Sequence, residues 1–115
     1  MQPHVHAWSE LEEDNPIPLL FRKRVFGEKM LFAKVLLKKG CHVTPHRHPS
    51  EQMSMTVSGH LRWTLGEPGQ EVETRPGSLL HIPSNVLHSV VALEDTEVID
   101  VLSPPGAMGV DSQGR

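Results

Sequence analysis

Short apolar runs separated by turn residues make up most of the chain from residue 21 onward. The run 61–65 alternates apolar and polar side chains with a period of two, the pattern of a strand with one buried face. Turn residues such as those at 66–69 recur roughly every eight to twelve residues, a spacing typical of sandwiches and barrels. No stretch shows a convincing helical period. Strands are therefore predicted at residues 21–26, 30–37, 42–48, 53–57, 61–65, 71–74, 78–82, 88–92 and 97–102.

The two ends of the chain lack this regular punctuation. Three prolines within residues 1–20 forbid a continuous helix there, so these residues are predicted to form an N-terminal arm. Residues 106–115 are polar and glycine-rich, and a flexible tail is predicted for them. Between the two ends, residues 21–105 are predicted to form a single all-β domain, which suits a chain of 115 residues.

Composition narrows the choice of partner and compartment. The formal net charge is −3 without a long run of one sign, which argues against nucleic acid or a membrane surface as the main partner. The basic cluster Arg22-Lys23-Arg24 is interpreted as a solvated face or rim. Cys41 is the single cysteine and is expected to be a small buried hydrophobe. Since no disulfide can form within the chain and no leader or membrane-spanning stretch is visible, a reducing cytoplasm is the expected location.

Eight histidines direct attention to a metal site. His46 and His48 lie one residue apart in an extended segment, so both rings face the same side and can converge on one ion. His4 and His6 have the same spacing, but no specific site is expected in the arm. A second segment places His88 at the start of a strand after a proline loop. In an antiparallel barrel the two segments can meet at the mouth, where small-molecule sites are common.

These two segments resemble the two motifs of the cupin family. Residues 40–59 read Gly-x5-His-x-His-x3-Gln-x6-Gly, and residues 76–88 read Pro-Gly-Ser-Leu-Leu-His-Ile-Pro-Ser-Asn-Val-Leu-His. The resemblance covers roughly residues 22–105. It implies a cupin double-stranded β-helix, a jelly-roll barrel of the RmlC-like type, with one divalent metal ion inside and often a homodimer.

The resemblance also implies the metal ligands, which fall at His46, His48, Gln52 and His88. Gln52 stands where the first motif usually has a carboxylate; Glu51 is the alternative, but it should point the other way. Three neutral imidazoles and a carboxamide leave the charge of a divalent ion uncompensated. The ion should therefore be a strong Lewis acid that readily holds an anionic ligand. Such a ligand set suits manganese, iron, nickel, copper and zinc alike.

Within the cupins, the closing strand resembles that of small pectin-degradation proteins that open unsaturated uronates. Residues 99–106 read Ile-Asp-Val-Leu-Ser-Pro-Pro-Gly. By this resemblance, Asp100 matches an aspartate that moves a proton near the metal. Leu102 stands in place of an aromatic residue, and Gly106 stands in place of an arginine that clamps the sugar carboxylate. Those two departures put the specific uronate activity in doubt, although an arginine of the basic cluster could substitute.

Two classes of function follow from these residues. The first is a metal-dependent enzyme acting on a small oxygen-rich substrate such as a sugar acid, by ring opening, isomerisation or a lyase-type proton transfer through Asp100. An iron-dependent dioxygenase with the same ligands is a variant. The second is a non-catalytic protein that binds or senses a small molecule. We favour the enzyme, and the position of Asp100 should discriminate: a place in the cavity favours catalysis, whereas backbone capping favours binding.

The strand that carries the predicted glutamine ligand can be assigned to two faces by parity. Ser54 and Thr56 share the face of the glutamine, and their small size leaves room for a ligand. Met53, Met55 and Val57 are expected to face the core of the sandwich.

Five further side chains could line the pocket without binding the metal. His42 is expected at the surface rather than the rim, His81 in packing or at the rim, and Lys34 in a snorkelling position. The five are Arg22, Arg24, Lys34, His42 and His81.

Overall fold

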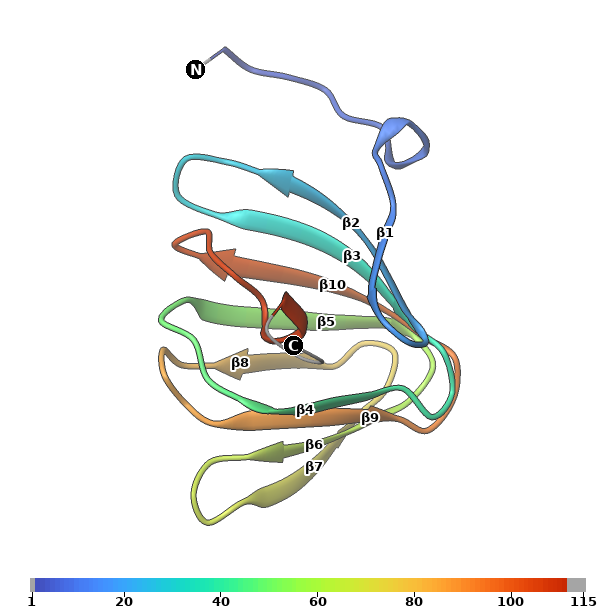
Figure 1. The fold of residues 1–115 in the computed structure, drawn as a ribbon, viewed down its shortest axis with the longest axis vertical. Helices are drawn as coiled ribbons and strands as arrows, with labels where there is room; N and C mark the ends of the chain where they lie inside the picture. The colour runs from blue at the N-terminus through green and yellow to red at the C-terminus, as the bar shows by residue number, and fades with distance from the viewer. Residues whose placement is uncertain (1, 112–115) are drawn as a thin grey trace.

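Two antiparallel β-sheets facing one another form the body of the computed structural model, which describes residues 2–111 (Figure 1). Within those residues, one sheet has the strand order β1-β2-β3-β10-β5-β8 and the other has the order β4-β9-β6-β7. The only helical segments described are two 3-10 turns, so this part of the chain has no helix long and apolar enough to cross a membrane. The elements are η1 Trp8–Glu10, β1 Asp14–Ile17, β2 Leu20–Phe26, β3 Leu31–Leu37, β4 His42–His46, β5 Glu51–Ser58, β6 Leu61–Leu65, β7 Gln70–Thr74, β8 Leu79–Ile82, β9 His88–Ala92, β10 Thr96–Ser103 and η2 Gly109–Asp111.

The predicted all-β jelly-roll class is confirmed, and each predicted strand forms within two residues of its expected ends. Strand β1 is the element that the sequence did not predict. It lies inside the expected arm, where Asp14 pairs with Arg22 and Ile17 pairs with Leu20. Pro16 lies within β1, and the strand is short, so no alternating pattern marks it. The division of the chain into arm, barrel and tail remains a prediction.

The interior lies between the two sheets and is built from one face of each strand. Strand β3 pairs along its whole length with β10, and buried side chains alternate with more exposed ones along both. Burying one aliphatic side chain of this size stabilises the fold by about 1.5–3 kcal/mol. The core combines Leu31, Ala33, Val35, Leu37, Val98 and Leu102 of the six-stranded sheet with Val43, Leu61, Trp63 and Val90 of the other.

Strand β5 distributes its side chains in the opposite way to an ordinary strand. Ser54 and Thr56 point inward and are each 2% exposed, as parity predicted. The prediction that Met53, Met55 and Val57 face the core was wrong, because these side chains are 47%, 42% and 42% exposed on the outer surface. A sheet in a two-layer sandwich has only one inward face. Since the polar residues of β5 occupy it, the apolar ones must point outward.

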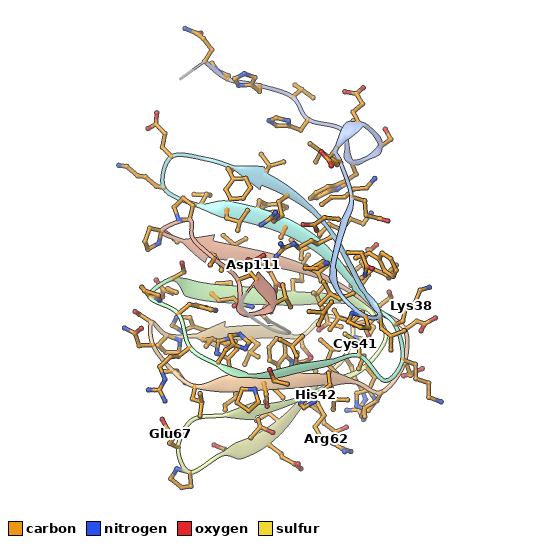
Figure 2. The ribbon with its side chains drawn as sticks, viewed as in Figure 1. Lys38, Cys41, His42, Arg62, Glu67 and Asp111 are labelled. Carbon is orange, nitrogen blue, oxygen red and sulfur yellow. The ribbon has the colours of Figure 1, made fainter. Side chains whose placement is uncertain are left out.

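The segment after β10 turns back over the open side of the sandwich. The tail was predicted to be flexible, yet Met108 and Val110 are buried in the core cluster. The turn η2 contacts β4 and β1, which are edge strands of the two different sheets. Figure 2 shows Asp111 of this turn in front of the sheets, near the middle of the view. Residues 112–115 of the predicted tail lie outside the described residues.

Arg22 corrects the interpretation of the basic cluster as a solvated face. Its side chain is 3% exposed and donates to Asp14 through Nε at 2.9 Å and through Nη2 at 3.2 Å. Nη2 also donates to the carboxylate of Asp111 in η2. Burial alone would lower the pKa of Arg22, but the hydrogen bonds to the two carboxylates outweigh it and raise the pKa above its ordinary value. Arg22 is therefore a buried cation that joins the C-terminal turn to the barrel.

Candidate metal centre

The candidate ligands come from both sheets and meet at one end of the interior. His46 ends β4 and His88 begins β9, and these two residues are directly paired in the antiparallel ladder. His48 follows β4 by two residues. Gln52 is on β5 in the other sheet, where it pairs with Ile82 and Leu102. The ladder of one sheet thus fixes two histidines, and the second sheet supplies the amide.

The three histidines have the geometry of a metal site. One ring nitrogen from each of His46, His48 and His88 lies within 4.8 Å of the other two. His48 and His88 are buried, and His46 is half-buried. Nitrogen atoms bound to a common ion at 2.0–2.1 Å would be separated by roughly 3 to 4 Å. These three histidines could therefore hold one metal ion after small rotations of their rings.

Hydrogen bonds to the backbone fix which nitrogen of each ring faces the cluster. Nδ1 of His46 bonds the carbonyl of Thr44 at 2.8 Å, and Nδ1 of His88 bonds the carbonyl of Val86 at 2.8 Å. Nδ1 of His48 bonds the carbonyl of Ser50 at 2.9 Å. A carbonyl can only accept, so each Nδ1 must carry the proton. Each neutral ring then has an unprotonated Nε2, the arrangement by which proteins orient a metal-binding histidine.

The electrostatics of the cluster also favour neutral rings. Burial lowers the pKa of His88 to about 4, and it lowers the pKa of His46 as well. At neutral pH these two imidazoles therefore hold free lone pairs rather than protons. Nε2 of His88 is buried without a hydrogen-bond partner among the described residues. A buried polar atom without a partner is unfavourable, and a bound cation would satisfy this one.

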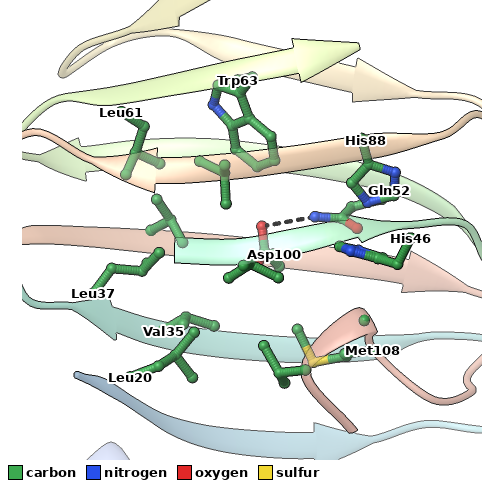
Figure 3. Close-up of a pocket in the computed structure, with 15 residues that line it drawn as sticks. Leu20, Val35, Leu37, His46, Gln52, Leu61, Trp63, His88, Asp100 and Met108 are labelled. Carbon is green, nitrogen blue, oxygen red and sulfur yellow. Dashed lines mark hydrogen bonds between the residues drawn. The ribbon is translucent and has the colours of Figure 1, made fainter. Parts of the chain in front are cut away.

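The side-chain amide of Gln52 is oriented by a short polar chain along the inner face. Its Nε2 donates to Oδ1 of Asp100 at 3.3 Å (Figure 3). The same nitrogen donates to Oγ of Ser54 at 3.0 Å. Ser54 also donates to Oδ1 of Asp100. Because the carboxylate accepts from the amide nitrogen, the amide oxygen must point toward the histidines. Oε1 of Gln52 lies 3.2 Å from Nε2 of His48. An ionised carboxylate thus selects the amide orientation that presents an oxygen ligand.

Asp100 lies on the wall of the cavity and has an unusual environment. It is 6% exposed, and burial raises the pKa of its carboxyl to about 6, against the opposing hydrogen bonds from Ser54 and Gln52. Its partners are side chains rather than backbone groups. The cavity that it lines together with His46, Gln52 and His88 has a volume of about 50 Å³. That space accommodates a metal ion and one or two waters, but not a sugar.

The other expected pocket residues lie elsewhere. Lys34 pairs with Glu97 on the outer face, and His81 pairs with Glu51 at 2.6 Å. Glu51 is exposed, so it points away from the histidines, as predicted. His42 is exposed, which also agrees with the sequence. All five side chains that could have lined the pocket are absent from the cavity wall, namely Arg22, Arg24, Lys34, His42 and His81.

Sequence reasoning missed the residues that close the cavity. Met108, Gly109 and Val110 all line it, on the side where Figure 3 shows the sulfur of Met108 opposite Trp63 and His88. The signal available was the apolar pair at positions 108 and 110 within an otherwise polar tail. Composition averaged over ten residues concealed that pair.

Comparison with known proteins places this centre in a family. A family model described as a cupin domain matches residues 33–102, more than half of the chain. The chain belongs to the cupin domain family. The matched segment contains all four candidate ligands and Asp100, so the candidate metal centre lies within the matched cupin domain.

Solved structures give the same fold. KdgF from Halomonas sp. has a TM-score of 0.84 and 27% sequence identity, covering 91% of this chain and 96% of that one. An RmlC-like cupin from Shewanella frigidimarina NCIMB 400 has a TM-score of 0.83 and 23% identity, covering 90% of this chain and 93% of that one. The second likeness, at this identity, concerns the fold alone. This chain is therefore a small cupin similar to KdgF.

A curated relative matches a shorter part of the chain. Acireductone dioxygenase from Bacillus cytotoxicus is 32% identical over 59 residues, which is 49% of this chain and 35% of that protein. The chain thus matches about a third of the length of this relative.

Proposed function

We propose that the chain is a metal-dependent enzyme in which His46, His48, Gln52 and His88 hold one divalent ion. The observation that carries this proposal is the clustering of one ring nitrogen from each of three histidines within 4.8 Å, with Nε2 of His88 buried and unpartnered among the described residues. The oriented oxygen of Gln52 supplies the fourth ligand. An ion held there would act as a Lewis acid toward an oxygen of the substrate.

Asp100 is proposed as the catalytic residue that transfers a proton. Both of its hydrogen bonds are accepted by Oδ1, which leaves Oδ2 available to exchange a proton with the substrate. A carboxyl group with a pKa near 6 can serve as acid and as base close to neutral pH. Ser54 and Gln52 would hold the carboxylate in place during that transfer.

The substrate is proposed to be a small oxygen-rich molecule such as a sugar acid, bound in the barrel of a cytoplasmic protein. The resemblance of residues 99–106 to the closing strand of cupins that open unsaturated uronates supports ring opening, isomerisation or lyase-type proton transfer. The likeness to KdgF over nearly the whole chain supports a small cupin of that kind. The shorter match to acireductone dioxygenase favours an alternative, an iron-dependent dioxygenase built on the same histidines. A second alternative is a protein that binds or senses a small acid without turnover. The ligand set alone does not choose among manganese, iron, nickel, copper and zinc.

A homodimer is proposed on the outer face of the six-stranded sheet. Phe32, Met53, Met55, Val57 and Leu79 are exposed there on three strands, β3, β5 and β8. A contiguous apolar surface of this kind on a small protein usually marks an interface. A second copy of the same sheet would offer the same apolar face in return.

Metal analysis of the purified protein, followed by a screen of sugar acids, tests the proposed enzyme. The Asp100→Asn variant is the control, since the new amide could still orient Gln52 with its side-chain oxygen but could not take up a proton at neutral pH. We expect one equivalent of metal in both proteins and turnover in the wild type alone. Unchanged turnover in Asp100→Asn would remove Asp100 from the mechanism, and absence of metal binding would refute the enzyme as proposed.

A further inference from the structure

The metal cavity is separated from the outside by a single turn of chain. The inner cavity has a volume of about 50 Å³, whereas an adjoining outer pocket has a volume of about 340 Å³. Both are lined by His46, Met108 and Gly109. The C-terminal turn, residues 108–111, is thus the partition between them. Pockets for small organic ligands usually measure about 300–1,000 Å³, so the inner cavity alone is too small for a sugar acid.

The C-terminal turn rests directly on a candidate metal ligand. A methyl group added at Gly109 would lie 2.2 Å from Nε2 and Cδ2 of His46 and 2.4 Å from Cε1. These nearly equal distances to three consecutive ring atoms place the backbone of the turn over the face of the imidazole. Only a glycine permits so close an approach, so the turn occupies space beside the metal centre that a bound ligand would need.

The C-terminal turn also supplies two hydrogen-bond acceptors to the buried guanidinium of Arg22. Nη2 of Arg22 donates to the carboxylate of Asp111, and Nη1 of Arg22 donates to the thioether of Met108 at 3.5 Å. A thioether is a weak acceptor for a charged donor. If the C-terminal turn withdraws, Arg22 keeps Asp14 but loses both of these partners. Nη1 then has lost its thioether partner and Nη2 keeps only Asp14, so both nitrogens can donate to a ligand that takes the place of the turn.

We propose that Arg22 is a carboxylate-binding residue of the metal pocket and that Asp111 occupies it until a ligand carboxylate displaces the C-terminal turn. A planar guanidinium matches a carboxylate through two parallel hydrogen bonds, which is the contact Asp111 now makes in part. Consecutive residues of the turn contact Arg22 and His46, and consecutive Cα atoms are about 3.8 Å apart. One small acid can therefore reach both the cation and an ion held by the histidines.

This inference rests on the proposed metal site for the second contact of the ligand, so its test has one arm that needs no metal. In a Trp8→Phe background, Trp63 is the only tryptophan; it lines the inner cavity and is 4% exposed. Acrylamide quenching of Trp63 in the metal-free chain reports whether the cavity is open. We expect Asp111→Ala to increase the quenching constant several-fold. Asp14→Ala, which removes the other carboxylate from Arg22 but leaves the turn in place, should leave it unchanged.

The second arm uses calorimetry on the zinc-loaded chain with D-galacturonate and with D-galactose, which lacks the carboxylate. We expect Asp111→Ala to bind galacturonate about tenfold more tightly than the wild type does, because the internal competitor is gone. Affinity for galactose should change much less. Asp95→Ala, which removes an exposed aspartate paired with Lys38, is the matched control and should behave as the wild type.

The outcomes separate this inference from the proposed function. Failure of zinc to bind would refute the proposed metal site, and Trp63 quenching would still decide whether Asp111 closes the cavity. Zinc binding with equal galacturonate affinity in Asp111→Ala and Asp95→Ala would overturn the role of Arg22 while leaving the metal site intact. If Asp111→Ala does not fold, the chain ending at Ala107 removes the same competitor and must show the same two changes.

Discussion

The two faces of strand β5 differ in a way that contradicts the usual rule for strands. Its inner face carries Gln52 and Ser54, and its outer face carries Met53 and Met55. Polar side chains inside require partners, and the two inner residues find them in Asp100 and in each other. Apolar side chains outside require a cover, which the proposed second copy would provide. Under the proposed function, the strand would separate metal chemistry on its inner face from assembly on its outer face.

This reversal explains why hydrophobicity alone misassigns the strand. A pattern of alternating residues fixes that neighbours point to opposite faces, but not which face is inside. At β5 the decision depends on Asp100 of the neighbouring strand, which pairs directly with Ser54. The following predictions test the two faces separately, beginning with the largest expected effect.

Adjacent residues at the start of β5 offer the sharpest contrast. Gln52→Leu removes the proposed oxygen ligand, and we expect metal affinity to fall about a hundredfold, since loss of an outer-shell partner alone costs about 10- to 100-fold. Met53→Leu changes the outer face and should leave the affinity unchanged. Metal titration by calorimetry measures both variants. Equal affinities in the two variants would show that the inner face does not bind the ion.

A charged substitution on the outer face of β5 tests the proposed dimer interface. Met55→Lys places two like charges in the proposed interface, and we expect the dimer dissociation constant to rise at least about thirtyfold, which corresponds to about 2 kcal/mol. Sedimentation velocity measures the change. Metal affinity in the resulting monomer should match the wild type, because the side chain of Met55 lies on the outer face, away from the hydrogen-bonded side chains of Gln52, Ser54 and Asp100. A wild-type protein that is already monomeric would remove the proposed role of this face.

The middle of the inner face should give an intermediate effect. Ser54→Ala deletes one donor to Asp100 and one acceptor from Gln52, so both side chains are held less firmly. We expect metal affinity to fall about tenfold, as for other partners that orient a metal ligand. Ser58→Ala, at the exposed end of the same strand, is the control. No difference between the two variants would mean that Gln52 is oriented without Ser54.

The smallest effect on metal affinity is expected at Thr56, two residues after Ser54 on the inner face. Thr56 is buried but does not take part in the hydrogen-bonded chain of Ser54, Gln52 and Asp100. Thr56→Val conserves its shape, and we expect metal affinity to stay within about twofold and unfolding free energy to change by less than about 1.5 kcal/mol. Calorimetry and urea denaturation measure the two quantities. A large loss of metal affinity in this variant would show that Thr56 also supports the metal site.

Much of the fold could be predicted because the turn residues that end each strand can be recognised from the sequence next to them. Glycine and proline turns fixed the ends of the strands, and parity placed Ser54 and Thr56 inward. The histidine pair at 46 and 48 was suggestive for the same local reason, since two residues apart on a strand means one shared face.

The remainder depends on contacts between distant segments, which no local pattern records. Arg22 looked like a surface residue because its partner Asp111 lies 89 positions away in the sequence. Met108 and Gly109 looked like tail residues because their contacts are with β4 and Arg22. Strand β1 escaped notice because it is only four residues long and contains Pro16, so it can be recognised only through its pairing with β2. The face of Met53 was misassigned because the position of Asp100 on the next strand decides it.

Anomalous diffraction from crystals of the zinc-loaded protein tests the central claim most directly. The account predicts one strong peak bonded to Nε2 of His46, His48 and His88 and to the side-chain oxygen of Gln52, with each Nδ1 still facing its backbone carbonyl. A peak bonded through Nδ1, a peak outside this cluster, or no peak after zinc loading would contradict it.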